Sequence, residues 1–374
     1  MEKHETVAAW FRVENAEEIP SPALLVYPDR VEQNIQTMIR MAGGTERLWP
    51  HVKTHKTAEI VNMQMKQGIL KFKCATIAEA EMVAGCGARQ LLLAIQPTGP
   101  NIDRLFRLKA KFPSTEISAI VDSEEVIRAI SERGVKTGLE TSLWLDVNCG
   151  MDRTGIVPGE EAIRLYRMIG TLPFLKNGGL HPYDGHIHEA SLSKRQDNNR
   201  KSFEPVLGML AKMKASDMEV PSIIAGGSPT MGILSETKSF DLSPGTSVLW
   251  DQGYGEAYSE MEYVPAAVLL MRIISKPNRN LVTIDLGTKA IASEMPHPRI
   301  KLLGLESYTV KGQWEEHMVI ETQAADTHHP GDVIYGVPYH ICPTVARYES
   351  MQVIEYHRYI ADWQILARNR KITI

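Results

Sequence analysis

The feature that most constrains this chain is a regular alternation of short apolar runs with segments of helical periodicity between residues 48 and 250. Runs rich in Val, Ile and Leu that are spaced by helices are typical of parallel strands buried on both faces. The segments between the runs carry apolar residues three and four positions apart, which favours amphipathic helices. The predicted strands are Leu48–Lys53, Lys71–Ala75, Gln90–Ile95, Glu116–Val121, Ser142–Val147, Gly179–Asp184, Pro221–Ala225 and Gly245–Trp250. Helices are predicted at Arg30–Met41, Ile77–Cys86, Ile102–Lys111, Glu124–Arg133 and Gly159–Ile169, among others.

Eight such units predict an α/β fold with a (β/α)8 TIM barrel, and a doubly wound open sheet is the competing architecture. After about residue 260 helical periodicity is weak and strand-like runs follow one another, which favours an antiparallel β domain. An extra strand, Pro22–Tyr27, precedes the barrel. We therefore expect a barrel domain over residues 25–260 and a discontinuous β domain over residues 1–24 and 261–374. The strands expected after the barrel are Ala266–Ile274, Leu281–Ile284, Met318–Glu321, Val333–Tyr335, Met351–Ile354 and Tyr359–Leu366.

Composition restricts the partners that such a protein can have. Of the 374 residues 43% are hydrophobic and 23% are charged, and the net charge is only -4, so neither nucleic acid nor a membrane surface is indicated. No apolar run reaches the roughly 18 residues that a membrane span requires. Met1–Glu5 leads into no apolar core of a signal peptide, and four scattered cysteines form no CxxC pair. We expect a cytoplasmic protein with reduced thiols.

Lys53 follows the first predicted strand, within the basic stretch His51–Lys56. Active sites of barrels lie at the carboxyl ends of the strands. A lysine at that position can be partly desolvated, so that its pKa falls and its amine can form a Schiff base. The alternative is a solvated basic turn without a catalytic role.

Two polar segments follow the fifth and sixth predicted strands. Arg153 lies in the glycine-framed loop Gly150–Gly155, where its guanidinium could hold an anionic oxygen. Tyr183 and His186 belong to the segment Tyr183–His188, which carries groups that can stack on an aromatic cofactor or form hydrogen bonds with it. The alternatives are an ordinary turn with a surface arginine and histidines without a function.

Glycine-rich turns lie at the seventh and eighth predicted strands. Gly226, Gly227 and Ser228 can form a nest of backbone N–H groups and a hydroxyl that binds an anion. Gly245 and Thr246, in a turn expected at the start of the eighth strand, could complete it. The loops after strands seven and eight are the usual phosphate site of this barrel.

His340 and Cys342 form a candidate metal site in the predicted β domain. In an extended segment, residues two positions apart point to the same side, and imidazole with thiolate favours zinc. Two protein ligands leave coordination positions open, as a catalytic metal requires. The alternative is a buried cysteine beside a histidine that is satisfied within the protein. His317, His328 and His329 of the same domain could support such a site or have no part in it.

Taken in order, these motifs resemble the D-threonine aldolase/D-serine dehydratase family of fold-type III pyridoxal 5'-phosphate (PLP) enzymes, whose barrel is alanine-racemase-like. The resemblance runs from Pro22-Ala23-Leu24 through His51–Lys56 to Trp363 and Ala367-Arg368. It implies that Lys53 carries PLP and that Arg153 contacts the phenolic oxygen of the cofactor. It also implies that the segment of Tyr183 and His186 flanks the ring, the Gly226–Ser228 nest holds the phosphate, and His340 and Cys342 bind the metal. A homodimer is expected by resemblance alone.

The resemblance leaves the reaction open. A PLP- and metal-dependent lyase of D-3-hydroxy amino acids, of D-threonine aldolase type, is our first hypothesis. Cys342 stands where aldolases of the family tend to have aspartate, which favours zinc over manganese and makes a D-serine or 3-hydroxyaspartate dehydratase the alternative. A racemase would need a second base such as Tyr254 or Tyr308. The fourth alternative is a non-catalytic PLP-binding protein, which a large β domain with a His-x-Cys pair disfavours.

Overall fold

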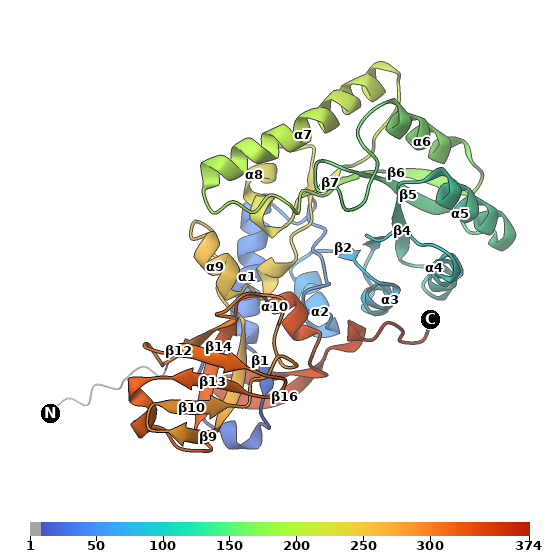
Figure 1. Cartoon of the computed structure of the whole chain (residues 1–374). Coiled ribbons are helices and arrows are strands. Elements are labelled where there is room, and N and C mark those ends of the chain that lie inside the picture. The colour runs from blue at the N-terminus through green and yellow to red at the C-terminus, as the bar shows by residue number, and fades with distance from the viewer. Residues whose placement is uncertain (1–8) are drawn as a thin grey trace. The chain divides into compact units, whose positions relative to one another are not determined.

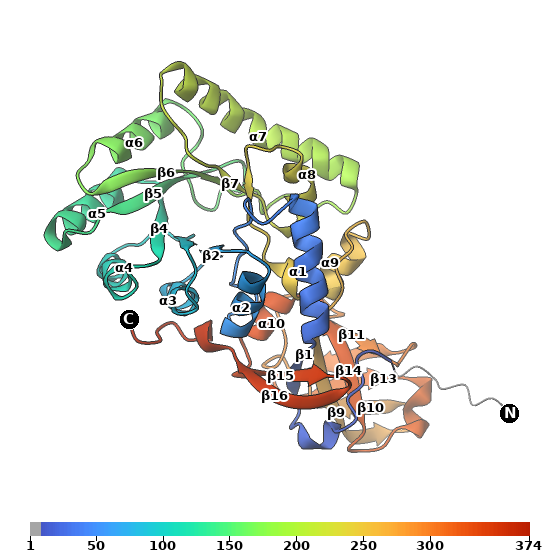
Figure 2. The same ribbon diagram turned by 180° about the vertical axis from the view of Figure 1, so that it is seen from behind.

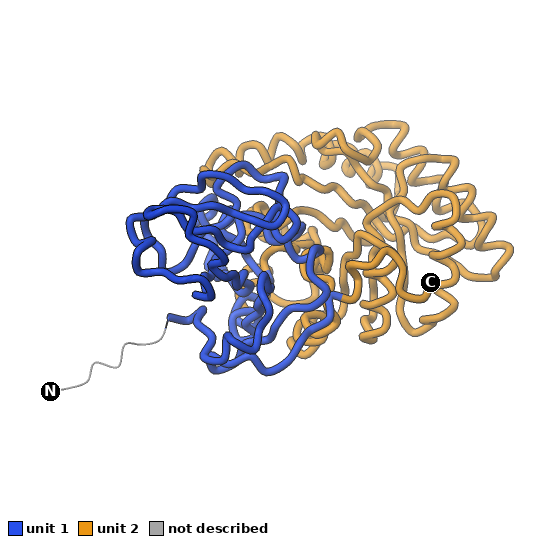
Figure 3. The backbone as a smooth tube through the Cα atoms, turned by 60° about the horizontal axis from the view of Figure 1, so that its bottom comes forward, with its two compact units in different colours: residues 1–34, 248–365 blue, residues 35–247, 366–374 orange. Residues whose placement is uncertain are grey.

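The computed structural model describes residues 9–374, so the Met1–Glu5 segment used above to argue against a signal peptide lies outside the described residues. The chain forms two compact units. Unit 1 consists of residues up to Asn34 together with Val248–Ile365, and unit 2 consists of Ile35–Ser247 together with Leu366–Ile374 (Figure 3). Each unit is described by itself.

Unit 2 contains the parallel strands and their helices (Figure 1). Five strands pair in sequence order and in parallel, and β7 pairs in parallel with β8. Isolated parallel bridges join Leu180 to Ile223, Leu48 to Leu242 and His51 to Lys73, so the segment around Leu48–His51 links β8 to β2. These links complete an eight-membered barrel and confirm the predicted fold class. The strands are β2 (Lys71–Cys74), β3 (Gln90–Leu93), β4 (Glu116–Val121), β5 (Thr141–Val147), β6 (Leu175–Pro182), β7 (Ile224–Ala225) and β8 (Asp241–Leu242).

The helices of the barrel begin where the sequence supplies capping groups. Ser123 accepts a hydrogen bond from the backbone N–H of Val126 at the start of α5, and Gly138 ends this helix with φ +70°. Such a left-handed residue at a helix end is accessible to glycine without strain. The views in Figures 1 and 2 show the helices on the outer side of the parallel strands. Their bounds are α1 (Pro28–Ala42), α2 (Ala58–Lys66), α3 (Ile77–Gly85), α4 (Pro100–Lys111), α5 (Glu124–Thr137), α6 (Glu160–Thr171), α7 (Leu192–Ala215) and α8 (Met231–Ser235).

Two of the predicted barrel strands were wrong in detail. Leu48–Lys53 forms only the two bridges named above, and Lys53 itself lies in a turn. Gly245–Trp250 is not the eighth strand, which is Asp241–Leu242, and Thr246–Val248 is a 3-10 helix. Pro244 has no N–H to donate to a sheet and ends the strand before it. The turn with Gly245 and Thr246 therefore follows the eighth strand instead of starting it.

Unit 1 is built on a nine-stranded sheet in the described part of the chain, with the path β12-β13-β10-β9-β1-β15-β16 and with β14 pairing with β9 and β11. All these pairs are antiparallel except β1 with β15. The antiparallel β sheet predicted for the second part of the fold is thereby confirmed. Its core contains Leu25, Val268, Leu270, Val337 and Ile354. The strands are β1 (Ala23–Val26), β9 (Ala267–Asn278), β10 (Leu281–Ile284), β11 (Ile300–Leu303), β12 (Thr309–Gln313), β13 (Met318–Glu321), β14 (Val333–Pro338), β15 (Ser350–Glu355) and β16 (Arg358–Gln364).

Two short helices interrupt this unit, α9 (Gln252–Ala257) and α10 (Ile341–Val345). Among the helices described for residues 9–374, none has both the length and the apolarity that a bilayer crossing requires.

Candidate functional site

The ring of Tyr183, just after β6, is where three cationic side chains of the barrel meet. The Lys53 Nζ lies 5.8 Å from the ring centroid, the Arg153 Cζ 5.1 Å, and the Lys73 Nζ 5.0 Å. These separations are within the range of cation–π attraction. The ring of His181 lies parallel to that of Tyr183, with centroids 6.4 Å apart. The structure thus brings together the predicted residues Lys53, Arg153 and Tyr183 at the carboxyl ends of the strands.

Lys53 is positioned by the turn that follows the bridge at His51. The backbone N–H of His51 donates to the carbonyl of Pro244, and the backbone N–H of Lys53 lies 3.3 Å from the His51 Nδ1 and donates to it. Lys53 is half-buried, whereas His51 is buried. Burial, and next the charge of Lys53, lower the pKa of His51 well below its ordinary value, so its ring is neutral. A neutral imidazole can accept the backbone hydrogen bond that orients the turn.

The loop that carries Arg153 is held by hydrogen bonds from its backbone N–H groups to two side chains, those of Asn148 and Asp122. The Asn148 Oδ1 accepts hydrogen bonds from the N–H groups of Gly150 and Asp152, at 3.0 and 3.2 Å. The Gly155 N–H donates to the Asp122 carboxylate at 2.9 Å, with φ +93°. A Cβ on Gly155 would lie 2.7 Å from the Asn148 nitrogen, so only glycine fits there. The loop can therefore present Arg153 in a fixed direction.

The two glycine turns after β7 and β8 lie against each other. The Gly245 N–H donates to the Ser228 Oγ at 3.2 Å, and Ser247 donates to the same oxygen at 3.1 Å. The Gly227 N–H donates to the Thr230 Oγ1 at 3.3 Å, and Gly226 has φ +75°. The predicted anion site residues Gly226, Gly227, Ser228, Gly245 and Thr246 therefore belong to one pair of adjoining loops, in which Ser228 and Thr246 are buried.

The ring of His186 points to helix α7. Its Nε2 lies 3.1 Å from the Ser202 Oγ, and a Cβ on Gly150 would lie 3.2 Å from the same nitrogen. The Asp184 carboxylate accepts a hydrogen bond from the Asn199 side chain at 2.9 Å, also from α7. Burial raises the pKa of Asp184. These contacts tie α7 to the segment after β6, and His186 also lies close to Gly150 in the loop of Arg153.

Sequence reasoning missed a buried chain of four polar side chains beside Tyr183, namely Ser243, Lys73, His181 and Asp146. The Lys73 Nζ donates to the Ser243 Oγ at 2.5 Å and lies 3.4 Å from the His181 Nε2. The His181 Nδ1 lies 2.7 Å from the Asp146 Oδ1. Lys73 was assigned to a strand interior and received no role. The sequence shows only that Lys71 and Lys73, two positions apart in a predicted strand, share one face of it.

These residues suit a phosphorylated aromatic cofactor. Three cations lie around one tyrosine ring, one of them the half-buried Lys53 in its turn, and adjoining glycine loops with hydroxyl groups lie at the same strand ends. The cations offset the negative charge of a phosphate and a phenolate, and an aromatic face offers a surface for stacking. The donor set therefore fits the cofactor that the sequence motifs imply.

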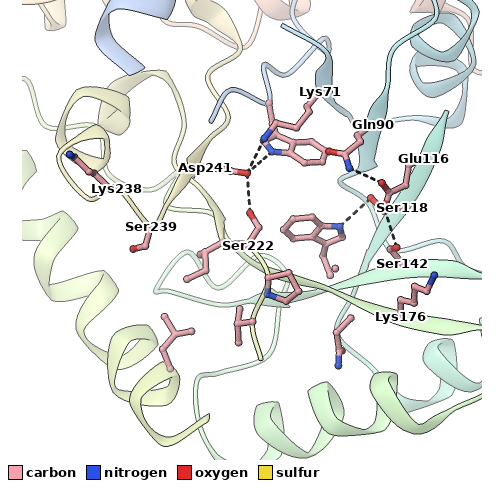
Figure 4. Close-up of a pocket in the computed structure, with 18 residues that line it drawn as sticks. Lys71, Gln90, Glu116, Ser118, Ser142, Lys176, Ser222, Lys238, Ser239 and Asp241 are labelled. Carbon is pink, nitrogen blue, oxygen red and sulfur yellow. Dashed lines mark hydrogen bonds and ion pairs between the residues drawn. The ribbon is translucent and has the colours of Figure 1, made fainter. Parts of the chain in front are cut away.

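A large cavity lies at the other end of the barrel (Figure 4). Its volume is about 750 Å³, and its lining includes the first residues of three strands, namely Lys71, Gln90 and Glu116. The Trp49 Nε1 donates to the Asp241 carboxylate at 2.8 Å, and the Trp144 Nε1 donates to the Ser118 Oγ at 3.2 Å. The indoles of the two tryptophans meet edge to face. Several of its polar groups hydrogen-bond to one another, and none of the site residues predicted from the sequence lines it, so we do not take it as the candidate site.

His340 and Cys342 lie together in unit 1, but not in an extended segment as predicted. His340 has extended dihedral angles and precedes α10, whereas Cys342 lies in the first turn of that helix. The helix starts here because the Asp251 carboxylate accepts the Ile341 N–H at 3.0 Å, and Pro343 is tolerated in a first turn.

The surroundings of His340 fit a metal ligand with an oriented ring. Its Nδ1 lies 2.8 Å from the Glu294 carboxylate, an arrangement that commonly fixes the ring of a metal-binding histidine. Burial alone would lower the pKa of His340, but its hydrogen bond and charge interaction with Cys342, and then Glu294, raise it to about 9. Within residues 9–374, however, no group of three or more His, Cys, Asp or Glu side chains is arranged to hold a metal ion. A metal ion bound by His340 and Cys342 would therefore need further ligands that are not side chains of residues 9–374.

The remaining candidates of unit 1 have other contacts. The imidazoles of His328 and His329 lie 3.8 and 3.9 Å from the Asp332 carboxylate, and the backbone carbonyl of His317 accepts the Trp314 N–H. The hydroxyl of Tyr308 donates to the carbonyl of Ile300.

Two family models match the chain. Residues 26–248 match the alanine racemase N-terminal domain, and residues 266–354 match the putative serine dehydratase domain. Among curated relatives, D-threonine aldolase of Arthrobacter sp is 24% identical over 356 residues, covering 94% of this chain and 93% of that protein. D-threo-3-hydroxyaspartate dehydratase of Delftia sp. (strain HT23) is 22% identical over 376 residues, covering 93% and 97%. These matches confirm the resemblance inferred from the motifs.

Solved structures share the fold over nearly the whole length. The D-threonine aldolase from Filomicrobium marinum has a TM-score of 0.86 at 22% identity, covering 94% of this chain and 96% of that one. D-threo-3-hydroxyaspartate dehydratase from Delftia sp. HT23 has a TM-score of 0.80 at 19% identity, covering 92% and 97%. One variant of that dehydratase is described as being in the metal-free form.

Proposed function

The chain belongs to the family of the alanine racemase N-terminal domain, and we propose that it is a PLP- and divalent-metal-dependent lyase of D-3-hydroxy amino acids. The proposed reaction is of D-threonine aldolase type and releases glycine and an aldehyde. The observation that carries the proposal is the convergence of Lys53 and Arg153 on the face of Tyr183, at the strand ends where the glycine loops adjoin. The curated relatives that match nearly the whole chain include aldolases and dehydratases, which supports a lyase.

Under this proposal each residue of unit 2 has one task. Lys53 binds PLP covalently, Arg153 holds its phenolic oxygen, and Tyr183 with the segment of His186 flanks its ring. The loops of Gly226, Gly227 and Ser228, with Gly245 and Thr246, hold the phosphate. PLP, when bound, weakens the bonds at the α-carbon of an amino acid by withdrawing electrons from it. The protein then selects the bond that breaks by placing a base.

His340 and Cys342 would bind the metal ion, with Glu294 orienting the ring of His340. A divalent ion supplies Lewis-acid polarisation of a hydroxyl oxygen, which lowers the pKa of that hydroxyl. Thiolate and imidazole favour zinc, and manganese is the alternative. Elemental analysis of the wild type and of His340→Ala tests this part, since the variant should lose the metal. Equal metal content in both proteins would contradict the assignment.

A dehydratase acting on D-serine or 3-hydroxyaspartate is the second candidate. The thiolate ligand favours it, because we expect aspartate in aldolases of the family, and a dehydratase is among the relatives. In that reaction the Lys53 amine would take the α-proton, a double bond would form between the α- and β-carbons, and the β-hydroxyl would leave as water. In the aldolase reaction the proton is taken from the β-hydroxyl instead.

Racemase activity and non-catalytic PLP binding are weaker alternatives. A racemase needs a second base, and Tyr308 donates its hydroxyl proton to a backbone carbonyl while Tyr254 packs against Trp250 and Tyr258. We also propose that the barrel, expected over residues 25–260, binds PLP and that the β domain, expected over residues 1–24 and 261–374, binds the metal. The compact units of the structure divide the chain instead after Asn34, Ser247 and Ile365. A cytoplasmic homodimer that acts on small D-amino acids, without nucleic acid or membrane partners, completes the proposal.

One assay decides between the reactions. Purified holoenzyme is incubated separately with D-threonine and D-serine, and the products are measured. Acetaldehyde and glycine from D-threonine support the aldolase, whereas a keto acid and ammonia from either substrate support the dehydratase. The L-enantiomers serve as controls and should yield no product. Conversion of D-alanine to L-alanine without any of these products would replace the lyase proposal by a racemase.

A further inference from the structure

Lys73 is a buried cation to which the proposed function gives no task. It lies in β2, is only 2% exposed, and donates to the Ser243 hydroxyl and towards the His181 Nε2. An ammonium group can only donate hydrogen bonds. The His181 Nε2 must then be the acceptor, and the His181 Nδ1 carries the hydrogen that the Asp146 carboxylate accepts. The contacts therefore define one consistent direction of hydrogen bonding from Lys73 to Asp146.

We propose that Asp146, His181 and Lys73 form a buried proton relay that places a titrating positive charge beside Lys53 and so controls the protonation of the Lys53 nitrogen. The inference rests on the proposed function, because it assigns Lys73 as a positioning residue for the cofactor-binding lysine. In the transfer step one proton leaves the Lys73 Nζ and joins the His181 Nε2. The hydrogen on the His181 Nδ1 stays on that nitrogen and keeps its hydrogen bond to the Asp146 carboxylate. The total charge of the three groups is unchanged, and no electrons are exchanged with a second reactant.

The electrostatic surroundings support this assignment. Burial, and next the charge of Lys53, lower the pKa of Lys73 to about 7. Burial and then Lys73 lower the pKa of His181, so its ring is neutral when Lys73 is charged. Burial alone would raise the pKa of Asp146, but its hydrogen bond and charge interaction with His181 lower it overall. The titratable groups that act on Lys73 from the surrounding elements are His51, Lys53, Asp146, Arg153, His181 and Asp184.

The same strand contains a matched control. Lys71 is two residues before Lys73, so both side chains point to the same face of β2. Lys71 lies at the amino end of the barrel, where its Nζ is 3.4 Å from the Asp241 carboxylate and its side chain is 21% exposed. The substitutions Lys73→Met and Lys71→Met remove the same charge from opposite ends of one strand. Only the first removes a charge near Lys53.

The test is a spectroscopic pH titration of the holoenzyme. The absorbance band of the lysine-bound cofactor is followed across pH in the wild type, Lys73→Met and Lys71→Met. A neighbouring cation repels a proton on the Lys53 nitrogen, so in Lys73→Met the titration midpoint should rise by about one pH unit. Lys71→Met should titrate as the wild type does. Equal midpoints in all three proteins, or equal shifts in both variants, would overturn the relay.

A second variant acts in the opposite direction. Asp146→Asn keeps a hydrogen-bonding side chain but removes a carboxylate that stabilises the charge of Lys73. Lys73 should then lose its proton at lower pH, so the inflection that a Lys73 pKa of about 7 predicts for the wild type should move to lower pH in this variant. An unmoved inflection in Asp146→Asn would contradict the relay even if Lys73→Met bound the cofactor poorly.

A cofactor-free measurement separates this inference from the proposed function. The pKa of Lys73 is about 7 in the fold and 10.5 as the ordinary value, so between these pH values the unfolded chain binds more protons than the folded one. The free energy of unfolding therefore gains a contribution that increases with pH across this window. In Lys73→Met this increase should be missing, and in Lys71→Met it should remain. If the wild-type protein lacked the absorbance band of the lysine-bound cofactor, the PLP proposal alone would fail. If the free energy of unfolding of Lys73→Met depended on pH as that of the wild type does, the relay would fail.

Discussion

The two ends of the barrel use similar side chains for different purposes. At the amino ends, the Asp241 carboxylate accepts hydrogen bonds from Trp49 and Ser222 and forms an ion pair with Lys71 (Figure 4). At the carboxyl ends, Lys53, Lys73 and Arg153 surround one tyrosine. Burial there lowers the pKa of Lys73, whereas Lys71 at the other end is partly exposed.

The comparison teaches that the strand end decides the role of a residue more than the residue type does. Lys71 and Lys73 share a strand, a face and a charge, yet Lys71 is paired in a partly exposed cavity, whereas Lys73 is buried near two other cations, Lys53 and Arg153, as well as two carboxylates. Concentrated like charge costs stability and is retained where it serves a reaction. We therefore expect substitutions at the carboxyl ends to change cofactor binding and activity, and substitutions at the amino ends to change stability.

The largest effect should come from Lys53→Ala. Without the amine the cofactor cannot be bound covalently, so its absorbance band should vanish and activity should fall by at least about 1000-fold. The control is Lys56→Ala in the same turn, whose side chain forms an ion pair with Glu79. Lys56→Ala should keep the band. A band that persists in Lys53→Ala would remove the basis for assigning the carboxyl ends to the cofactor.

Arg153→Met should have the next largest effect. Loss of a charge-assisted hydrogen bond to the cofactor should lower cofactor affinity and reduce kcat/KM by about 100-fold, since such bonds contribute up to about 3 kcal/mol. Cofactor affinity is measured by titrating the apoenzyme and following the band. Arg164→Met, on the exposed face of α6 with ion pairs to Glu124 and Glu161, is the control and should bind PLP normally. Equal affinities of the two variants would exclude Arg153 from the site.

Sequence periodicity was sufficient for the fold class because buried parallel strands and their helices differ in apolar spacing. The rule that sites lie at carboxyl ends then led to Lys53, Arg153 and Tyr183 without tertiary information. No role was predicted for Lys73 because a lysine inside an apolar run gives no sign of the layer of the barrel interior in which its side chain lies. That layer depends on the register of β2 with the bridge at His51.

The candidate metal ligands show a second limit of sequence reasoning. His340 and Cys342 were placed in an extended segment, but Cys342 lies in α10. The carboxylate that receives the first N–H of this helix belongs to Asp251, which is 90 residues away in the chain. A helix start that depends on such a distant group has no local signal. The eighth strand was misplaced for the opposite reason, because the apolar run after Pro244 resembles a strand although the proline ends the sheet.

A smaller effect, on stability alone, is expected for Asp241→Ala at the amino ends. The substitution leaves the Trp49 Nε1 and the Ser222 hydroxyl without their acceptor, so the free energy of unfolding should fall by about 1–3 kcal/mol. Urea unfolding measures this change, and kcat/KM per folded molecule should stay that of the wild type. A loss of activity larger than about tenfold in the folded fraction would break the division between the two ends of the barrel.

The smallest effect should come from Lys71→Met. Its ion pair with Asp241 spans 3.4 Å between partly exposed groups, and such pairs contribute less than about 1 kcal/mol because solvent screens them. The Lys71 Nζ also lies 5.1 Å from the Trp49 ring, and a methionine side chain keeps an apolar contact there. We expect urea midpoints close to those of the wild type and an unchanged cofactor spectrum. If Lys71→Met altered the spectrum as strongly as Lys73→Met, the charge at the amino ends would act over the length of the barrel, and the functional difference between its ends would be lost.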